Sequence, residues 1–166
     1  MKIKSLLLSA FIFISMSLAA QNHEHEHELD HQHKHHYMYE LGISNGVVYN
    51  ATEKEFAYGA HVHFIRTIGE SQKLGIGIGY ERIFDDHKHN ALNIILHYRP
   101  AEHLSLNIAP GVVWLDSEKN SLKPGLHIEG LYEFELGRFH IGPIIGIGFN
   151  TEDLHASLGL HLAVGF

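Results

Sequence analysis

Hydrophobic and polar residues alternate along most of the chain, and the alternation is clearest in its last stretch, residues 154–166. There, Leu158 and Leu160 share one parity, whereas His155 and His161 share the other. A β-strand places alternate side chains on opposite faces, so this stretch predicts a strand with one apolar face and one small or polar face. A helix would need apolar residues to recur every three to four positions, and they do not.

The same alternation recurs along the chain, with short polar turns between the segments. The predicted strands cover about 37–49, 56–68, 74–84, 91–99, 103–115, 122–136, 139–150 and 154–166. The connections leave no room for crossover helices, so the strands follow one another as antiparallel hairpins. The sequence therefore predicts an all-β fold, an eight-stranded antiparallel up-and-down barrel with both termini at the same end. Pro110 and Pro143 fall within strands, where each removes a ladder hydrogen bond, so we expect β-bulges there.

The aromatic residues indicate which face of this barrel is outside. Alternation alone fits a soluble, lipocalin-like barrel with an apolar interior as well as a membrane barrel with an apolar exterior. All fifteen Phe, Tyr and Trp residues beyond position 20 lie on the apolar parity and gather near strand ends. The ring at the end of the termini holds Tyr37, Tyr39, Phe64, Tyr98, Tyr132, Phe134, Phe139 and Phe166, and the other ring holds Tyr49, Phe56, Tyr58, Tyr80, Phe84, Trp114 and Phe149. An apolar band between two aromatic girdles is typical of a barrel that spans a bilayer.

The opposite parity carries polar and charged side chains with glycines between them. They are Glu40, His61, His63, Glu81, Asn93, His97, Arg99, His127, Glu129, Glu133, Arg138, His140, His155 and His161. Eight strands enclose only enough space for side chains, so long polar groups need small neighbours such as Gly75, Gly79 and Gly148. We expect these residues to fill the lumen, with Arg99 and Arg138 pairing the carboxylates.

The strand count, the two aromatic belts and the terminal Leu-Ala-Val-Gly-Phe carry a family resemblance. Over residues 37–166 the chain resembles the small eight-stranded outer-membrane β-barrels of Gram-negative bacteria, the OmpA-transmembrane and OmpX-like architecture. The resemblance implies a place in the outer membrane in contact with its lipid, with both termini in the periplasm. It also implies that the barrel-assembly machinery reads the C-terminal Phe166. It brings no catalytic residues, and the short loops at both ends do not favour adhesion or receptor roles.

Residues 1–20 have the layout of a secretory signal peptide. Lys2 and Lys4 precede an apolar run that ends in Ala19 and Ala20, and this run is short for a spanning helix. Removing the two lysines takes the formal charge from −7 to −9, which argues against a nucleic-acid partner. The chain contains no cysteine, which excludes disulfides and a thiolate metal site.

Residues 21–36 hold seven of the seventeen histidines, alternating largely with acidic residues. A single leucine cannot form a core, so we expect this tail, on the periplasmic side, to be disordered without a ligand. Neutral imidazole is the commonest protein ligand for zinc, copper and nickel. The predicted tail ligands are His23, His25, His27, His31, His33, His35 and His36. The alternative is a solubilising low-complexity tail without a metal role.

Histidines of the lumen are the second set of predicted metal ligands: His61, His63, His97, His140 and His161. The alternative is a buried hydrogen-bonded network, which small barrels need as their core. We therefore expect an outer-membrane barrel that binds or buffers divalent metal, zinc first, with metal-transport proteins as possible partners. The competing hypothesis is a structural barrel or narrow pore without a specific ligand. We do not expect an enzyme, because His155 and Ser157 would both point inward and need Glu129 or Glu133 from across the lumen.

Overall fold

The computed structural model describes residues 37–69, 71–118 and 121–166. The predicted signal peptide, residues 1–20, and the histidine-rich tail, residues 21–36, lie outside the described residues. The elements are β1 (Tyr39–Asn50), β2 (Glu55–Ile68), β3 (Leu74–Ile83), β4 (His89–Ala101), β5 (Leu104–Leu115), the 3-10 turn η1 (Asp116–Glu118), β6 (Lys123–Tyr132), β7 (Phe134–Leu136), β8 (Phe139–Asn150) and β9 (Leu154–Gly165). The predicted strands are confirmed with small shifts at their ends, and the sixth is divided into β6 and β7 at Glu133.

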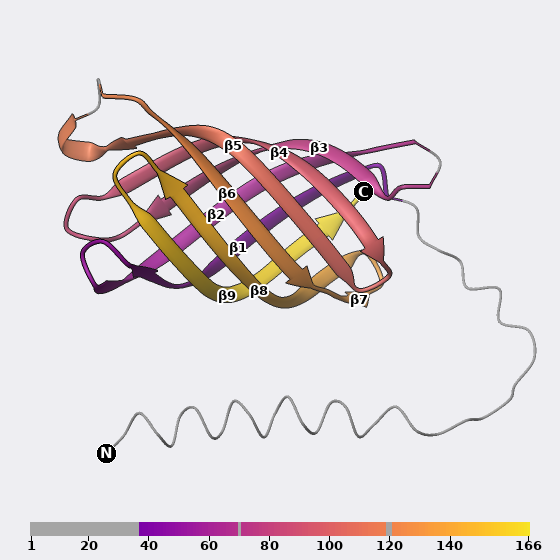
Figure 1. The fold of residues 1–166 in the computed structure, drawn as a ribbon. Helices are drawn as coiled ribbons and strands as arrows, with labels where there is room; N and C mark the ends of the chain where they lie inside the picture. Colours follow the sequence, from indigo (N-terminus) through magenta and orange to yellow (C-terminus); the bar gives the residue numbers. More distant parts are fainter. Residues whose placement is uncertain (1–36, 70, 119–120) are drawn as a thin grey trace, which may run out of the picture. The chain divides into compact units, whose positions relative to one another are not determined.

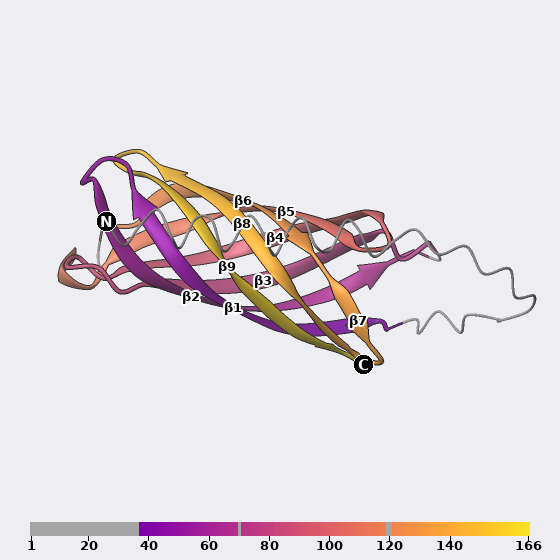
Figure 2. The same ribbon diagram turned by 90° about the horizontal axis from the view of Figure 1, so that it is seen from below.

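The strands close into a barrel in which each is antiparallel to its neighbours (Figures 1 and 2). They are paired in the order β6-β5-β4-β3-β2-β1-β9-β8, and β6 pairs with β8 to complete the circle. The two ends of the barrel-forming chain meet, since the Tyr39 amide donates to the Phe166 carbonyl at 3.0 Å and the reverse bond measures 2.9 Å. We call this the terminal end of the barrel. The turn between β1 and β2 and the turn between β8 and β9 lie at the other end, the loop end.

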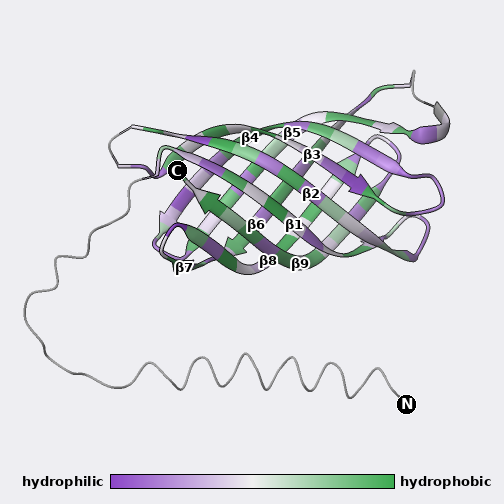
Figure 3. Cartoon of the chain, turned by 180° about the vertical axis from the view of Figure 1, so that it is seen from behind, coloured by the Kyte–Doolittle hydropathy of each residue, from purple (hydrophilic) through white to green (hydrophobic). Residues whose placement is uncertain are grey.

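The outer surface of the barrel is apolar, as the alternation predicts. Leu158 on β9 and Ile145 on β8 are 63% and 61% exposed, whereas polar side chains of the opposite parity are buried. Figure 3 shows hydrophobic and hydrophilic residues alternating along the strands. A soluble barrel would reverse this arrangement, so the lipocalin-like alternative is wrong. No helix within the described ranges is long and apolar enough to cross a membrane.

A small apolar cluster lies inside the lumen, where the sequence pattern predicted mostly polar residues. Ile65 on β2, Ile95 on β4 and Ala109 on β5 pack together and are almost completely buried. Three cavities lined by lumen residues have about 30 Å³ each, which is enough for one water-sized particle. The lumen is therefore a packed core of mixed polarity.

The predicted bulges at Pro110 and Pro143 are wrong. Pro110 stays in register with Leu126 of β6, and Pro143 with Leu160 of β9. A proline removes an N–H and thus a rung, but it inserts no extra residue and need not shift the register. The β4–β5 register shifts instead between Tyr98 and Ala101, next to the turn.

Candidate metal centre in the barrel lumen

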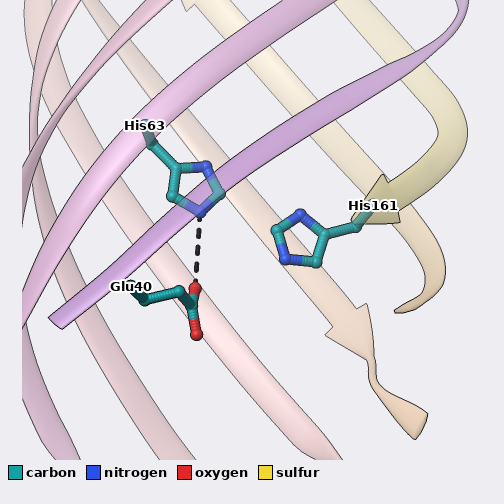
Figure 4. A group of neighbouring side chains, drawn as sticks. All are labelled: Glu40, His63 and His161. Carbon is teal, nitrogen blue, oxygen red and sulfur yellow. Dashed lines mark hydrogen bonds and ion pairs between the residues drawn. The ribbon is translucent and has the colours of Figure 1, made fainter. Parts of the chain in front are cut away.

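Glu40, His63 and His161 come together in the lumen from three adjacent strands, β1, β2 and β9 (Figure 4). Gly42 pairs with His63 across β1 and β2 and provides the space for the rings. A Cβ at Gly42 would lie 2.3 Å from His63 Nε2 and 2.8 Å from His161 Cε1. The two imidazoles stack with their ring centroids 5.2 Å apart and their planes 6° apart. Strand parity directs both histidines into the lumen, and the absence of a side chain at Gly42 leaves the space in which their rings stack.

The donor atoms of this group are close enough to share one ion. Each of Glu40, His63 and His161 is buried and offers a ligand atom within 4.8 Å of the other two. His63 Nε2 lies 3.4 Å from Glu40 Oε1, the contact drawn in Figure 4. Zinc binds such atoms at roughly 2.0–2.2 Å, so tetrahedral geometry separates neighbouring ligand atoms by about 3.4 Å. The observed spacing suits zinc with small side-chain adjustments.

Glu133 adds a fourth donor to this cluster. His161 and Glu133 are 1% and 2% exposed, and His161 Nε2 lies 3.7 Å from Glu133 Oε1. Neither atom has a hydrogen-bond partner among the residues that the structure describes. A buried polar atom without a partner costs about 1–3 kcal/mol. A cation between these two atoms would satisfy both.

The other polar atoms of the candidate ligands are held by neighbours. Ser44 Oγ lies 3.1 Å from His161 Nδ1, and this hydroxyl can accept a hydrogen bond that leaves Nε2 with its lone pair. His140 Nδ1 lies 3.1 Å from Glu40 Oε2, so Oε1 faces His63. Outer partners of this kind orient metal ligands.

Arg99 supplies positive charge at the terminal side of the cluster. Its Nη2 lies 3.2 Å from Glu133 Oε2 and 3.8 Å from Glu40 Oε2. Ser105 donates a further hydrogen bond to Glu133 Oε2 at 2.5 Å. The predicted pairing by Arg99 is confirmed, but that by Arg138 is wrong. Arg138 lies in the exposed β7–β8 turn with its guanidinium 5.6 Å from the Phe139 ring, because the hairpin ends before this residue can turn inward.

The structure separates the predicted lumen ligands into two sets. His63, His140 and His161 lie around Glu40 and Glu133. His61 Nδ1 is 3.3 Å from Glu129, and His97 Nδ1 is 2.9 Å from Asn107 Oδ1. Neither belongs to the candidate ligand groups, although His97 lines a cavity together with Glu40 and His140. The predicted tail ligands, His23, His25, His27, His31, His33, His35 and His36, lie outside the described residues.

A second cluster, Glu81, His127 and His155, lies nearer the loop end. Sequence reasoning placed these residues in the lumen but did not include them among the metal ligands. The parity of β3, β6 and β9 predicts that these three side chains face the lumen. It does not predict that they lie close together, because their proximity depends on the register between strands far apart in the sequence.

His155 and Ser157 share a face of β9. His155 Nδ1 is 3.6 Å from Asp153 and its Nε2 is 4.0 Å from Glu81. Within the described ranges, neither ring nitrogen of His155 has a hydrogen-bond partner. His155 therefore makes no hydrogen bond to Ser157.

No protein-family model matches the sequence, and no curated protein sequence matches it. The fold is similar to that of Neisserial surface protein A, with a TM-score of 0.56 and 10% identity over 77% of this chain and 96% of that chain. For a de novo designed transmembrane β-barrel the TM-score is 0.53 and the sequence identity 16%, over 76% of this chain and 94% of that chain. For Ail, the attachment invasion locus protein of Yersinia pestis, the TM-score is 0.50 and the sequence identity 13%, over 77% of this chain and 96% of that chain. At these identities the likeness concerns the fold alone. This chain has the eight-stranded, closed antiparallel fold of the small transmembrane β-barrels, and its structural neighbours include outer-membrane barrels consistent with the OmpA and OmpX-like architecture.

Proposed function

We propose that this protein is an outer-membrane β-barrel that binds divalent transition metal, zinc first and copper or nickel next. The ion would bind in the lumen between Glu40, His63, His161 and Glu133, and the histidine-rich residues 21–36 would capture it on the periplasmic side. Lipid of the outer membrane surrounds the barrel in this proposal, and the barrel-assembly machinery recognises the exposed Phe166. Metal-transport proteins are the expected partners.

The membrane part of the proposal rests on the exterior. Side chains at mid-strand positions such as Ile94 and Leu160 are exposed and apolar, and aromatic residues flank them toward both ends. Water would make such a surface aggregate, whereas a bilayer favours it. The fold of the outer-membrane neighbours supports the same location.

The metal part rests on a single observation, the facing of His161 Nε2 and Glu133 Oε1 at 3.7 Å. Both are buried, and in the described part of the chain neither has a hydrogen-bond partner. With His63 and Glu40 beside them, the donors comprise two imidazoles and two carboxylates, a set that zinc accepts. No thiolate is available, which favours borderline divalent ions over thiophilic ones.

A structural barrel without a specific ligand is the second candidate, and the Arg99 network favours it. Arg99 already pairs Glu133 and approaches Glu40, so part of the negative charge is compensated without an ion. Packing of the lumen also favours a plug over a pore. Planar-bilayer recording distinguishes the two forms of this candidate, because stable conductance steps require a continuous water path and a plug gives none.

Zinc titration of the protein purified from outer membranes in detergent tests the proposal. Isothermal calorimetry compares the native chain with a variant in which the seven tail histidines are asparagine, here called the tail-Asn chain. Loss of binding equivalents in the tail-Asn chain supports capture by the tail, and equal stoichiometry and affinity remove the tail from the proposal.

Within the tail-Asn chain, His161→Asn tests the lumen site. We expect this substitution to remove one zinc equivalent, whereas His103→Asn, at an exposed histidine, leaves the stoichiometry unchanged. Far-UV circular dichroism confirms that each variant keeps its β-structure. Unchanged stoichiometry in a folded His161→Asn variant contradicts binding at this site.

A further inference from the structure

The second cluster, Glu81, His127 and His155, is assembled around one glycine. Gly148 on β8 pairs with His127 of β6 on one side and with His155 of β9 on the other. A Cβ at Gly148 would lie 2.3 Å from His155 Nε2, so the ring occupies space that only glycine leaves. Glu81 reaches the same place from β3, across the lumen. Three strands that are distant in sequence therefore deliver two imidazoles and a carboxylate to one point.

The polar atoms of this cluster are close together but incompletely used. Glu81 Oε2 lies 2.9 Å from His127 Nδ1, and Glu81 Oε1 lies 4.0 Å from His155 Nε2. His127 is 6% exposed, and its Nε2 finds no hydrogen-bond partner among residues 37–69, 71–118 and 121–166. The same holds for both ring nitrogens of His155. Each of the three residues offers one ligand atom within 4.8 Å of the others.

The charges around the cluster favour a cation. Glu81, Glu129 and Asp153 bring carboxylates to this part of the lumen, where each lies beside a histidine, and Glu129 also accepts a hydrogen bond from Asn107. In the described ranges, no lysine or arginine forms an ion pair with any of these three. The cluster of Glu40, His63, His161 and Glu133, the Glu40 cluster, differs because Arg99 provides a fixed positive charge there. A bound divalent ion would supply the charge that the loop-end cluster lacks.

An ion has room in this part of the lumen. A cavity of about 30 Å³ is lined by Glu81, His127, His155, Asn90, Asn150 and Asp153, among others. Asp153 lies in the β8–β9 turn at the loop end, and its carboxylate is 3.6 Å from His155 Nδ1, where it can orient the ring. This volume suits one ion that replaces a water.

We propose that Glu81, His127 and His155 form a second divalent transition-metal site, distinct from the Glu40 cluster and facing the loop end. Two imidazole nitrogens and one carboxylate oxygen bind the ion, and a water completes a tetrahedral zinc shell. The site uses none of the residues of the Glu40 cluster, so it stands even if that cluster binds nothing. The barrel would then carry one metal site toward each end, with the packed layer of Asn107, His61 and Glu129 between them.

Stoichiometry tests the second site directly. In the tail-Asn chain, calorimetric zinc titration should give two equivalents. His155→Asn should remove one of them and His161→Asn the other, with His103→Asn as the matched control that removes neither. If only His161→Asn removes a zinc equivalent, the second site is overturned and the proposed function stands. If only His155→Asn removes one, the second site stands and the proposed site at the Glu40 cluster is overturned.

Cobalt(II) absorption keeps the test decisive should His155→Asn fail to fold. A tetrahedral cobalt site absorbs strongly in the visible range, and the tail-Asn chain with His161→Asn should still show this band through the second site. Glu81→Gln, which keeps the side-chain shape, should then abolish it. A band that is missing before Glu81→Gln, or that survives it, overturns the second site.

Discussion

Substituting Gly42→Ala tests whether the packing of the lumen histidines depends on a missing side chain. The added methyl carbon would lie 2.3 Å from His63 Nε2 and 2.8 Å from His161 Cε1, well inside contact distance. Both rings are buried and stack on each other, so neither can turn aside into open space. Overpacking of this kind costs about 1–3 kcal/mol.

Gly130→Ala is the matched control, because a Cβ there meets Ile145 and Leu106 only at 3.7 and 3.8 Å. Both substitutions reduce the entropy of the unfolded chain and gain about 0.4–1 kcal/mol from it. Gly130 faces outward and Gly42 inward, so the clash dominates the difference between the two variants without being its sole component. We expect Gly42→Ala to be less stable than Gly130→Ala by about 1–3 kcal/mol. Urea unfolding in lipid vesicles, followed by the fluorescence of Trp114, measures this difference. Equal free energies of unfolding would refute the close approach of the rings to Gly42.

Three further substitutions test other parts of the structure. Ile94→Arg, at a mid-strand exterior position, should lower the free energy of unfolding in vesicles by about 2–4 kcal/mol, while Leu136→Arg near the terminal end should cost about 0–1 kcal/mol; equal costs would contradict a lipid-facing surface. Glu133→Gln removes the shortest ion pair of Arg99, which keeps its longer contacts to Glu40 and Glu135 and its hydrogen bond to Ser105, and should cost about 2–3 kcal/mol. The exposed Glu135→Gln should cost about 0.5 kcal/mol or less, and urea unfolding measures both. Gly148→Ala should displace His155 and weaken zinc binding at the loop end in calorimetry while the equivalent that depends on His161 persists, and loss of the latter equivalent would contradict the separation of the two sites.

The strands and their faces could be predicted because period-two alternation is a local property. The parity of Leu158 and His161 is enough to place one outside and the other inside once the aromatic belts define the lipid side. The apolar cluster of Ile65, Ile95 and Ala109 was not expected. Its members lie on the polar parity, and nothing local marks them as packing partners.

The grouping of the lumen side chains could not be predicted, since it depends on the stagger between strands. Parity places His63 and His161 in the lumen, but it does not predict that their rings stack beside Gly42. It also missed that Gly148 brings His127 and His155 together from both of its neighbours. The shear of the barrel decides which lumen side chains become neighbours, and shear is a property of the closed sheet.

The most direct test of a lipid-facing exterior uses Trp114, the chain's single tryptophan, which lies near the loop end beside Tyr80. The purified protein is inserted into vesicles whose acyl chains carry bromine at shallow or deep positions, and the tryptophan fluorescence is recorded. An aromatic side chain of a membrane girdle should be quenched by bromine, and more strongly by the shallow label than by the deep one. Absence of quenching, together with a protein that stays monomeric in buffer without detergent, would contradict a membrane-spanning barrel.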